Sequence, residues 1–433
     1  MSQHRRTRAS RIGLIAAPLA VGALVLAGCS GTSSDNSSTS GGPQQFSFTY
    51  VTSNNIESAF EAIAKVYMQE HPEVKITLNA QPNDQYDQTL RTQLQAGNAS
   101  DLVETSPGTG QGRSLIPLAK AGFLEPLNDK ATALVPENSK SQFILNGKTY
   151  GAPTDLTFIG MVENETAAKA AGVSTFPADW DSLKAACTSA KSAGKSFAVL
   201  AGAAAPNTGL LAMVIAATRV YADNPKWDQD RADKKVTFAD SDGWKAALKT
   251  VTDLKDAGCF QSGVEGAGFD AITNGMAQGT SVASFIPAPS VAQLASAAKD
   301  QTFAVQAFPP AASSDKPFGF ASINYALSIT KASKNKAAAQ AFLDWLGEPA
   351  NAKKFADIDG GLPVSGVGDL DLSKTPYAPV ADILKSGDYT GLPNSNWSNA
   401  AVYDALSTGV QGLLTGQKSV SDVLKAMDAA WDQ

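Results

Sequence analysis

Residues 46–51 read FSFTYV, residues 74–79 read VKITLN and residues 102–105 read LVET, and these three short stretches decide the fold. Apolar and polar side chains alternate along the first of them, which is typical of a β-strand. Residues 54–69, which begin with an Asn-x-x-Glu capping pair, predict a helix between the first two strands. Residues 86–96 predict a second helix before the third strand. Strands that alternate with helices predict an α/β fold with a mostly parallel sheet covered by helices.

Ligands of such sheets bind beyond the carboxyl ends of the strands, here the loops 52–55 and 106–112. The second loop contains Gly-Thr-Gly-Gln-Gly at 108–112, whose spacing and place in the chain differ from those of the dinucleotide-binding motif. We therefore expect a loop whose backbone can approach a ligand closely. The candidate ligand-binding residues of the two loops are Asn54, Asn55, Ser106, Gly108 and Thr109.

The N-terminal segment is typical of an export signal. Four arginines lie within residues 5–11, and an uncharged apolar run follows at 12–26, shorter than the roughly 20 residues that span a bilayer. The run ends in Leu-Ala-Gly-Cys at 26–29, which resembles the lipobox of bacterial lipoproteins. The resemblance implies that residues 1–28 are a signal peptide and that Cys29 is lipidated. Residues 29–43 would form a flexible tether, rich in Ser and Gly, that holds the protein on the outer face of the cell membrane.

The composition excludes several functional classes. The chain has a net charge of −6, which becomes more negative once the four signal arginines are removed, and it has no basic block, so a nucleic-acid partner is not expected. His71 is the one histidine of the predicted mature chain. A Ser-His-Asp triad or a zinc site built from several histidines therefore lacks its residues, and we expect no cofactor and no metal.

Cys187 and Cys259 form an even pair once Cys29 is assigned to the lipid. In an oxidising compartment such a pair predicts a structural disulfide. It would close a loop of roughly 70 residues and stabilise the fold by roughly 4 kcal/mol. Two free buried thiols are the alternative.

Six short motifs in order along the chain resemble those of the family 1 extracellular solute-binding proteins, the maltose-binding-protein-like group. They are KTYGAPTD at 148–155, FPADWDSL at 176–183, NGMA at 274–277 with the strand 281–285, ALSI at 326–329 with the helix 338–346, GLPV at 361–364 and LTGQ at 414–417. The resemblance covers nearly the whole predicted mature chain. It implies a two-lobed periplasmic-binding-protein-like fold with an interdomain cleft and several hinge crossings.

Carried onto this chain, the family architecture implies a first lobe of residues 44–154 and 310–356. The second lobe would comprise residues 155–309 and 357–433. The implied function is that of a binding protein, not an enzyme. It would capture a small neutral solute, foremost a sugar or oligosaccharide, by closing the lobes around it. The closed form would then deliver the solute to the permease subunits of an ABC importer.

Sugar sites need polar side chains for the hydroxyls and aromatic rings for the apolar ring faces. Asp155 lies at the first crossing, where relatives often place an acid that binds the ligand. Trp397 lies in the polar stretch 393–399, close to where relatives place a stacking aromatic ring, and Tyr403 is its neighbour in this role. The remaining candidates are Phe285, Phe320, Asn324 and Gly361. Asn207, which follows Pro206 at a predicted helix start, is a further candidate. Many sugar-binding relatives have a Trp near residue 285, and this chain does not.

Two other functions stay open. One is a binding protein for a peptide, a polyamine or a glycerol phosphate, and the other is a secreted glycosidase that uses two carboxylates. A polyamine would need several acids, and a phosphate would need Arg or Lys. The candidate loops contain few of either apart from Asp155 and Arg113. This balance favours a neutral, hydroxylated ligand.

Overall fold

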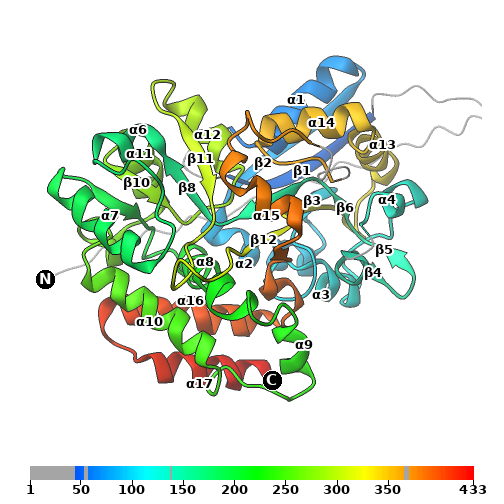
Figure 1. Cartoon of the computed structure of the whole chain (residues 1–433). Helices are drawn as coiled ribbons and strands as arrows, with labels where there is room; N and C mark the ends of the chain where they lie inside the picture. Colours follow the sequence, from blue (N-terminus) through cyan, green and yellow to red (C-terminus); the bar gives the residue numbers. More distant parts are fainter. Residues whose placement is uncertain (1–43, 53–56, 137–138, 365–369) are drawn as a thin grey trace, which may run out of the picture. The chain divides into compact units, whose positions relative to one another are not determined.

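The structure is a computed structural model that describes residues 44–52, 57–136, 139–364 and 370–433. The predicted signal peptide, Cys29, the tether, Asn54 and Asn55 lie outside the described residues. The described part belongs to one compact unit, in which two sheets are each packed between helices (Figure 1). No helix among these residues has both the length and the apolar character needed to cross a membrane.

The first sheet has five strands in the order β2-β1-β3-β13-β6. Its strands are β1 (Gln44–Thr52), β2 (Val74–Pro82), β3 (Leu102–Thr105), β6 (Ala152–Pro153) and β13 (Ala326–Ile329). Strand β1 pairs in parallel with both β2 and β3, which confirms the predicted parallel arrangement. Strand β13, which belongs to a chain segment that returns to this sheet much later, is antiparallel to β3 and β6.

Helices α1 (Ala59–Glu70) and α2 (Asn83–Ala96) connect the first three strands. The prediction that α1 is capped by the Asn-x-x-Glu pair is wrong. Its N-cap is Ser58, whose hydroxyl accepts a hydrogen bond from the backbone N–H of Phe60 at 3.1 Å. Glu57 instead pairs with Lys65 at 2.7 Å. The cap therefore lies four residues later in the chain, directly before the first buried turn of the helix.

Both faces of the first sheet are covered. Phe46 and Phe48 of β1 pack in one cluster with α1, α13 (Lys336–Leu346) and α14 (Pro349–Asp359). On the other face, Val103 of β3 packs in a second cluster with α2 and α3 (Leu115–Lys120). Alternate side chains of a strand point to opposite faces, so each strand of the central part of the sheet contributes to both clusters.

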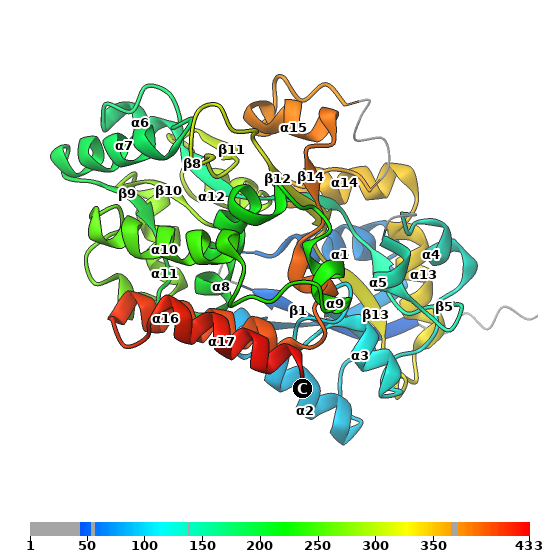
Figure 2. The same cartoon turned by 60° about the horizontal axis from the view of Figure 1, so that its bottom comes forward.

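The second sheet has four strands in the order β11-β8-β10-β9. They are β8 (Met161–Asn164), β9 (Ser196–Val199), β10 (Ser281–Ser284) and β11 (Phe303–Gln306). One face packs against α6 (Glu165–Ala170), α7 (Trp180–Ser192), α8 (Ala205–Ala216), α10 (Asp242–Asp256), α16 (Ala400–Thr415) and α17 (Val420–Trp431). The other face packs against α11 (Phe269–Ala277), α12 (Ser290–Ala297) and α15 (Ala381–Ser386). Figures 1 and 2 both show α16 beside α17.

The remaining elements are short. They are α4 (Asp129–Ala133), α5 (Lys140–Phe143), β4 (Ile144–Leu145), β5 (Lys148–Thr149), the π-helix η2 (Ala217–Tyr221), α9 (Trp227–Ala232), and the 3-10 helices η3 (Val264–Gly266), η5 (Ala378–Val380) and η6 (Pro393–Asn396).

Three chain crossings join the two lobes. The first runs from β6 through β7 (Leu156–Ile159), and the second runs through β12 (Gly319–Ile323) into β13. The third follows α14 (Pro349–Asp359), where Leu362 and Leu156 exchange two backbone hydrogen bonds of 2.8 Å. Strands β7 and β12 form a small third sheet with β14 (Tyr389–Thr390). This two-lobed arrangement confirms the predicted fold class.

The second crossing lies later than the expected boundary at residue 310. Phe318 and Phe320 are buried in the core of the second lobe, together with Phe285 and Phe308. The chain therefore returns to the first sheet only after Ile323, since the side chains before it are held by the second lobe.

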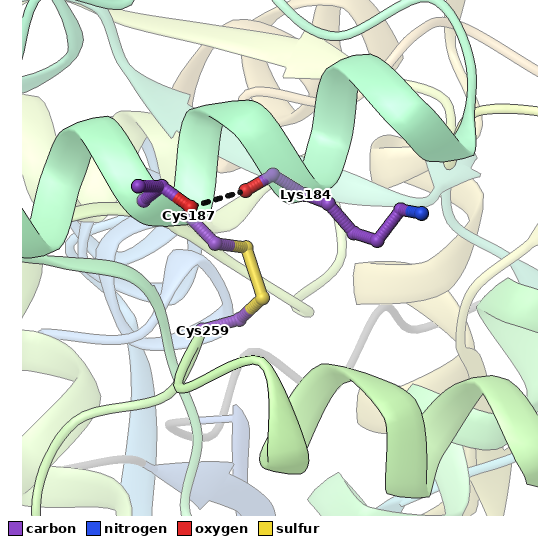
Figure 3. The surroundings of a disulfide bond; sticks show 4 residues. Lys184, Cys187 and Cys259 are labelled. Carbon is purple, nitrogen blue, oxygen red and sulfur yellow. Dashed lines mark hydrogen bonds between the residues drawn. A yellow bond between two sulfur atoms is a disulfide. The ribbon is translucent and has the colours of Figure 1, made fainter.

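The second lobe contains the predicted disulfide. Cys187 of α7 is bonded to Cys259, which follows α10, with 4.8 Å between their Cα atoms. Figure 3 shows the bond, with Lys184 of the same helix pointing away from it. Both cysteines are buried in the lobe core, so the bond ties α7 to the chain that leads back to the sheet.

Candidate functional site

A cavity of about 300 Å³ lies between the lobes and is lined by residues of both lobes and of the crossings. This volume is at the lower end of the range for small-molecule sites. The cavity faces the carboxyl ends of β2 and β3 in the first lobe and the first turns of α8, α11 and α12 in the second. That is the place where ligands bind to α/β sheets.

The first-lobe wall is organised by Arg113, which is buried. Its Nε lies 2.6 Å from Oδ1 of Asp87, and Nη2 donates to Oδ1 of Asn83 at 2.6 Å. Nη1 lies 3.4 Å from Oε1 of Glu104, which is buried below the wall. Burial raises the pKa of Glu104 to about 7, although Arg113 acts in the opposite direction. Arg113 is thus already paired inside the protein, and it shapes the wall rather than offering a free charge.

The second-lobe wall combines the first turns of α8, α11 and α12 with one exposed acid, Asp404. Asn207 lines the cavity, but its amide accepts from the N–H of Ala201 at 2.9 Å and donates to the carbonyl of Phe285 at 2.8 Å. Tyr403 of α16 lies half-buried on the same wall, and its hydroxyl donates to the carbonyl of Pro206 at 2.9 Å. The polar atoms of Asn207 are thus used internally, whereas the ring of Tyr403 lines the cavity.

The crossings form the floor of the cavity. Asn324 lines the floor, as does Asp359, the last residue of α14. Asp155 lies beneath Asp359, fully buried, and its Oδ1 accepts a hydrogen bond from Thr154 at 2.8 Å. Gly361 packs against it so closely that a Cβ at Gly361 would lie 2.3 Å from Oδ2 of Asp155. The floor therefore holds two neighbouring carboxyl groups, of which Asp359 reaches the cavity.

The surroundings of Asp155 and Asp359 raise the pKa of both carboxyls. Burial raises the pKa of Asp155 to about 6. Burial and the charge of Asp155 raise the pKa of Asp359 well above its usual range, and Glu104 adds to the effect. Tyr325 and Tyr377, the other titratable groups that face the pair, have raised pKa values and are neutral at physiological pH.

The raised values predict that the protein loses stability as the pH rises from about 4, where these carboxyls ionise in the unfolded chain, towards their folded-state pKa values, about 6 for Asp155. A carboxyl with a higher pKa in the folded state binds its proton more tightly there, so its contribution is complete at low pH and disappears as the pH passes the folded-state pKa. Each group that keeps its proton in the folded state while the unfolded chain has lost it lowers the free energy of unfolding by up to about 1.4 kcal/mol per pH unit. Thermal unfolding at a series of pH values measures the slope.

Replacing Asp359 by Asn removes one of these titrating groups and should flatten the profile. The matched control is Asp357→Asn on the same helix, because Asp357 is exposed and pairs with Lys353 at 2.6 Å. That variant should keep the slope of the unmodified protein. An Asp359→Asn profile as steep as that of the control would contradict the assignment.

The structure brings only some of the predicted site residues together. Ser106, Asn324 and Tyr403 line the cavity, and so does Asn207. The predicted ligand-binding roles of Phe285 and Phe320 are not supported, because both rings are buried in the core of the second lobe, 1% and 0% exposed. Asp155 and Gly361 lie below the floor, side by side and in contact with each other. Asn54 and Asn55 lie outside the described residues.

The predicted stacking role of Trp397 is corrected in the same way. Trp397 is 0% exposed, its Nε1 donates to Oδ1 of Asp228 at 3.1 Å, and its ring lies 5.6 Å from that of Phe238 and 6.1 Å from that of Trp244. Tyr221 donates to the same carboxyl oxygen at 2.7 Å. The polar neighbours of Trp397 suggested an exposed ring, but they form the short helix η6 while the indole packs inward.

Gly108 and Thr109 belong to a contact between the lobes, not to the cavity wall. The N–H of Thr109 donates to the carbonyl of Ser395 at 2.8 Å, and its hydroxyl donates to the carbonyl of Trp397. Gln142 adds a bond of 3.1 Å from Nε2 to Oδ1 of Asn396. We call this arrangement, loop 107–112 against segment 393–397, the interlobe contact. The predicted close approach of the glycine loop is therefore to a protein segment of the other lobe.

The sequence reasoning missed several residues of the cavity wall. They are Asn83, Asp87, Phe269, Tyr325, Asp359 and Asp404. Gln111 also lines the cavity and lies in the predicted ligand loop 106–112, and Arg113 directly follows that loop. Asn83 and Asp87 follow β2, so the rule that ligands bind beyond the carboxyl ends of strands applies to them as it does to the loops after β1 and β3. Asp359 and Asp404 carry no such local signal, since only the closure of the lobes brings them to the cavity.

Comparison with known proteins agrees with this architecture. Residues 52–353 match the model of a family described as bacterial extracellular solute-binding protein. The chain belongs to this family. The membership confirms the resemblance seen in the sequence motifs, and it makes the cavity between the lobes the candidate solute site of a bacterial extracellular solute-binding protein.

Relatives of this solute-binding protein match along most of their length. A protein of Brucella abortus (strain 2308), described as a binding protein, is 28% identical over 383 residues, which are 86% of this chain and 88% of the relative. The multiple sugar-binding protein of Streptococcus mutans is 21% identical over 387 residues, with the same coverage of 86% and 88%.

Solved structures share the fold. A chitin oligosaccharide binding protein superposes with a TM-score of 0.73 at 19% identity, covering 90% of this chain and 98% of its own. A protein in complex with raffinose superposes with a TM-score of 0.69 at 19% identity, with coverage of 90% and 98%. At this identity the likeness establishes the two-lobed fold.

Proposed function

We propose that this protein is the substrate-binding component of an ABC importer and that it captures a saccharide in the cavity between its lobes. The observation that carries the proposal is the chemistry of the wall. Hydroxyl and amide side chains line it together with aromatic rings. The polar set is Asn83, Ser106, Gln111, Ser290, Gln293, Ser322 and Asn324, and the aromatic set is Phe269, Tyr325 and Tyr403.

This combination suits a sugar because polar side chains match its hydroxyl groups and aromatic rings match its apolar faces. Hydroxyl groups donate and accept hydrogen bonds, which amides and Ser hydroxyls can match. The C–H faces of the ring pack on aromatic side chains. Several of the family members and structural relatives are named for oligosaccharides or sugars, and their names support the same assignment for this chain.

The mode of action we propose follows from the crossings and from the interlobe contact. The solute would bind with the lobes apart and hold them together once bound, and the closed form would be presented to permease subunits. We further propose that the protein is exported and held on the outer face of the membrane by lipid on Cys29. The lobes we propose are residues 44–154 with 310–356 and residues 155–309 with 357–433. Burial of Phe318 and Phe320 in the second-lobe core supports a second return to the first lobe that follows Ile323.

A glycerol phosphate is a weaker candidate because it needs a free cationic side chain. Among the described residues that line the cavity, Arg113 is the one Lys or Arg, and it is already bound to Asp87 and Glu104. A protein that bound phosphate would have to break this pairing. The wall therefore favours a ligand without negative charge.

The test is thermal unfolding of the chain from the tether onwards, with mono-, di- and oligosaccharides and with peptides and glycerol phosphates as comparators. A ligand at 100 times its dissociation constant stabilises the folded state by about 2.7 kcal/mol, which shifts Tm by a few degrees. We expect such a shift with a saccharide. A shift with a phosphate or peptide only, or with none of the compounds, would contradict the proposal.

The site is tested with Asn324→Ala, which removes an amide from the cavity floor. The matched control is Asn98→Ala, since Asn98 is exposed beyond the end of α2, away from the cavity lining. The saccharide shift should shrink in the first variant and persist in the second. Equal shifts in both would place the ligand elsewhere.

A further inference from the structure

Asn83 and Asp87 lie one helical turn apart at the start of α2, and both line the cavity. Residues four apart on a helix lie on the same face. Both side chains contact the guanidinium group of Arg113. Its Nη2 donates to Oδ1 of Asn83 at 2.6 Å, and its Nε lies 2.6 Å from Oδ1 of Asp87. The amide and the carboxyl group are therefore fixed next to each other on the first-lobe wall.

Arg113 is itself fixed from the core of the first lobe. Its third nitrogen, Nη1, lies 3.4 Å from Oε1 of the buried Glu104, and its Cζ lies 4.9 Å from the centroid of the Tyr86 ring. The hydroxyl of Tyr86 donates in turn to the carbonyl of Glu104 at 2.7 Å. All three guanidinium nitrogens thus have a partner. A planar group bound in this way determines the orientation of the side chains that it contacts.

The contacts with Arg113 decide which atom of each side chain is left for a ligand. A guanidinium group only donates, so the atom of Asn83 that it contacts must be the amide oxygen, and the NH₂ group is left as a donor. That group donates to none of the described residues. Oδ1 of Asp87 is buried, whereas the side chain as a whole is 38% exposed, so Oδ2 is left as an acceptor. The wall therefore offers one donor and one acceptor.

Gly112, in the loop after β3, leaves room for the carboxyl group of Asp87. A Cβ at residue 112 would lie 2.6 Å from Oδ2 and 2.8 Å from Cβ of Asp87, so a larger residue would displace this side chain. Gly112 also lines the cavity, and its carbonyl accepts from Nε of Arg91 at 2.8 Å. That bond ties the loop to α2. The loop and the helix together thus keep Asp87 in place.

The side of the cavity formed by α8 and α16 has a different character. The amide of Asn207 and the hydroxyl of Tyr403 are engaged within the second lobe. The hydroxyl of Ser407 donates to the carbonyl of Tyr403 at 2.7 Å. Leu210 and the ring of Tyr403 supply apolar surface there. This side can support an apolar face of a sugar, so we expect hydroxyl groups to be distinguished at α2.

We propose that Asn83 and Asp87 recognise one free hydroxyl group of the saccharide and that Arg113 is their positioning residue. The hydroxyl accepts from Nδ2 of Asn83 and donates to Oδ2 of Asp87, and a hydroxyl is able to do both. This inference rests on the proposed function and adds the group that decides which saccharides bind. A carboxylate of the solute is repelled by Asp87, and an ammonium group has no lone pair with which to accept from Asn83. Because both residues lie on one turn of one lobe, the pair is formed before the lobes close.

The experiment replaces the hydroxyl groups of the solute one at a time. The parent compound is the saccharide that raises Tm most in the unfolding panel, which begins with glucose, galactose, mannose, maltose, cellobiose and lactose. It is compared by calorimetry with its monodeoxy and monodeoxyfluoro analogues. We expect one position at which both replacements lower the affinity about 10- to 100-fold, the range of a hydrogen bond to a charged group. Fluorine fails there as hydrogen does, because neither can donate to Asp87.

Two variants connect this hydroxyl group to the pair. Asp87→Asn keeps an oxygen for Arg113 and replaces the free acceptor by a donor. Asn83→Asp keeps an oxygen for Arg113 and replaces the free donor by an acceptor. Each should lower the affinity for the parent saccharide about 10-fold or more and leave that for the deoxy analogue nearly unchanged, so that the two affinities converge. The matched controls are Asp84→Asn and Asn98→Asp, both at exposed residues away from the cavity lining, which should keep the full difference.

Arg113→Lys tests the positioning role. Lysine keeps the positive charge beside Glu104 but lacks the planar fork, so it cannot hold both side chains of the pair. The ratio of the affinities for the parent saccharide and its deoxy analogue should shrink, whereas a purely structural role of Arg113 would leave this ratio unchanged. If Arg113→Lys fails to fold, Asp87→Asn and Asn83→Asp decide the inference.

The outcomes separate the inference from the proposed function. If every monodeoxy analogue binds as tightly as its parent, the inference is overturned and saccharide capture stands. If one position matters but the difference persists in both Asp87→Asn and Asn83→Asp, the hydroxyl group is recognised elsewhere, and the inference is again overturned. If no saccharide of the panel binds, the inference and the proposed function both fall.

Discussion

Replacing Gly110 by Ala is expected to lower the affinity for the solute by about 10- to 100-fold, with little change in the stability of either lobe. A Cβ at residue 110 would lie 1.4 Å from the carbonyl oxygen of Asn394, and one at Gly108 would lie 1.9 Å from that of Ser395. Both obstacles are backbone atoms, so the lobes must move apart. The interlobe contact then loses its hydrogen bonds, which together contribute about 1.5–3 kcal/mol to the closed form.

Two measurements check this expectation. Calorimetry with the saccharide that stabilises the unmodified protein gives the affinity, and small-angle scattering without ligand gives the radius of gyration, which should increase. The control is Gly266→Ala, because a Cβ there meets nothing within 4 Å and the backbone is not in the left-handed region. A Gly110→Ala protein with unchanged affinity and unchanged scattering would show that the interlobe contact does not contribute to closure.

Removing the disulfide is expected to cost about 4 kcal/mol of folding free energy. Cys187 and Cys259 are 72 residues apart in the chain, and the loss of a cross-link over a loop of that size increases the entropy of the unfolded state. Both side chains are buried, so Ala is the appropriate replacement, and the double variant C187A/C259A avoids a lone thiol. Thermal and denaturant unfolding should show a lower transition for the second lobe.

Reduction provides the control for this prediction. Dithiothreitol should lower the Tm of the unmodified protein towards that of the double variant and leave the variant itself unchanged. The variant should still bind its solute at low temperature, because the bond lies in the core of the second lobe and neither cysteine lines the cavity. Equal unfolding free energies with and without the bond would contradict the prediction.

The elements of the first sheet could be predicted because their signals are local. Residues 46–49 of the first strand alternate apolar and polar side chains, so the buried Phe46 and Phe48 can be identified from the sequence. The start of α1 could not be predicted in the same way, since Asn54 and Ser58 are both good caps. The disulfide was predictable for a different reason, because one pair of cysteines is left once Cys29 is assigned to the predicted lipid.

The candidate site was predicted less well than the fold. Ser106, Asn324 and Tyr403, which were predicted to bind the ligand, line the cavity, whereas Trp397 lies in the core. The polar sequence around Trp397 indicates that the backbone of 393–399 is partly exposed, but it does not determine where the indole points. That direction is decided by Asp228, more than 160 residues earlier, which accepts a hydrogen bond from the ring.

What the sequence determined by itself is the class of molecule: alternating strands and helices, the ordered motifs of a solute-binding family, and one cysteine pair. These features depend on residues that are close in the chain or on residue types that are rare. The tertiary structure alone decided which side chains line the cavity, that the glycines of loop 107–112 serve the interlobe contact, and that Asp359 and Asp404 share one space. The reason is physical, because a cavity between lobes is built from segments that meet only after both lobes have folded and closed.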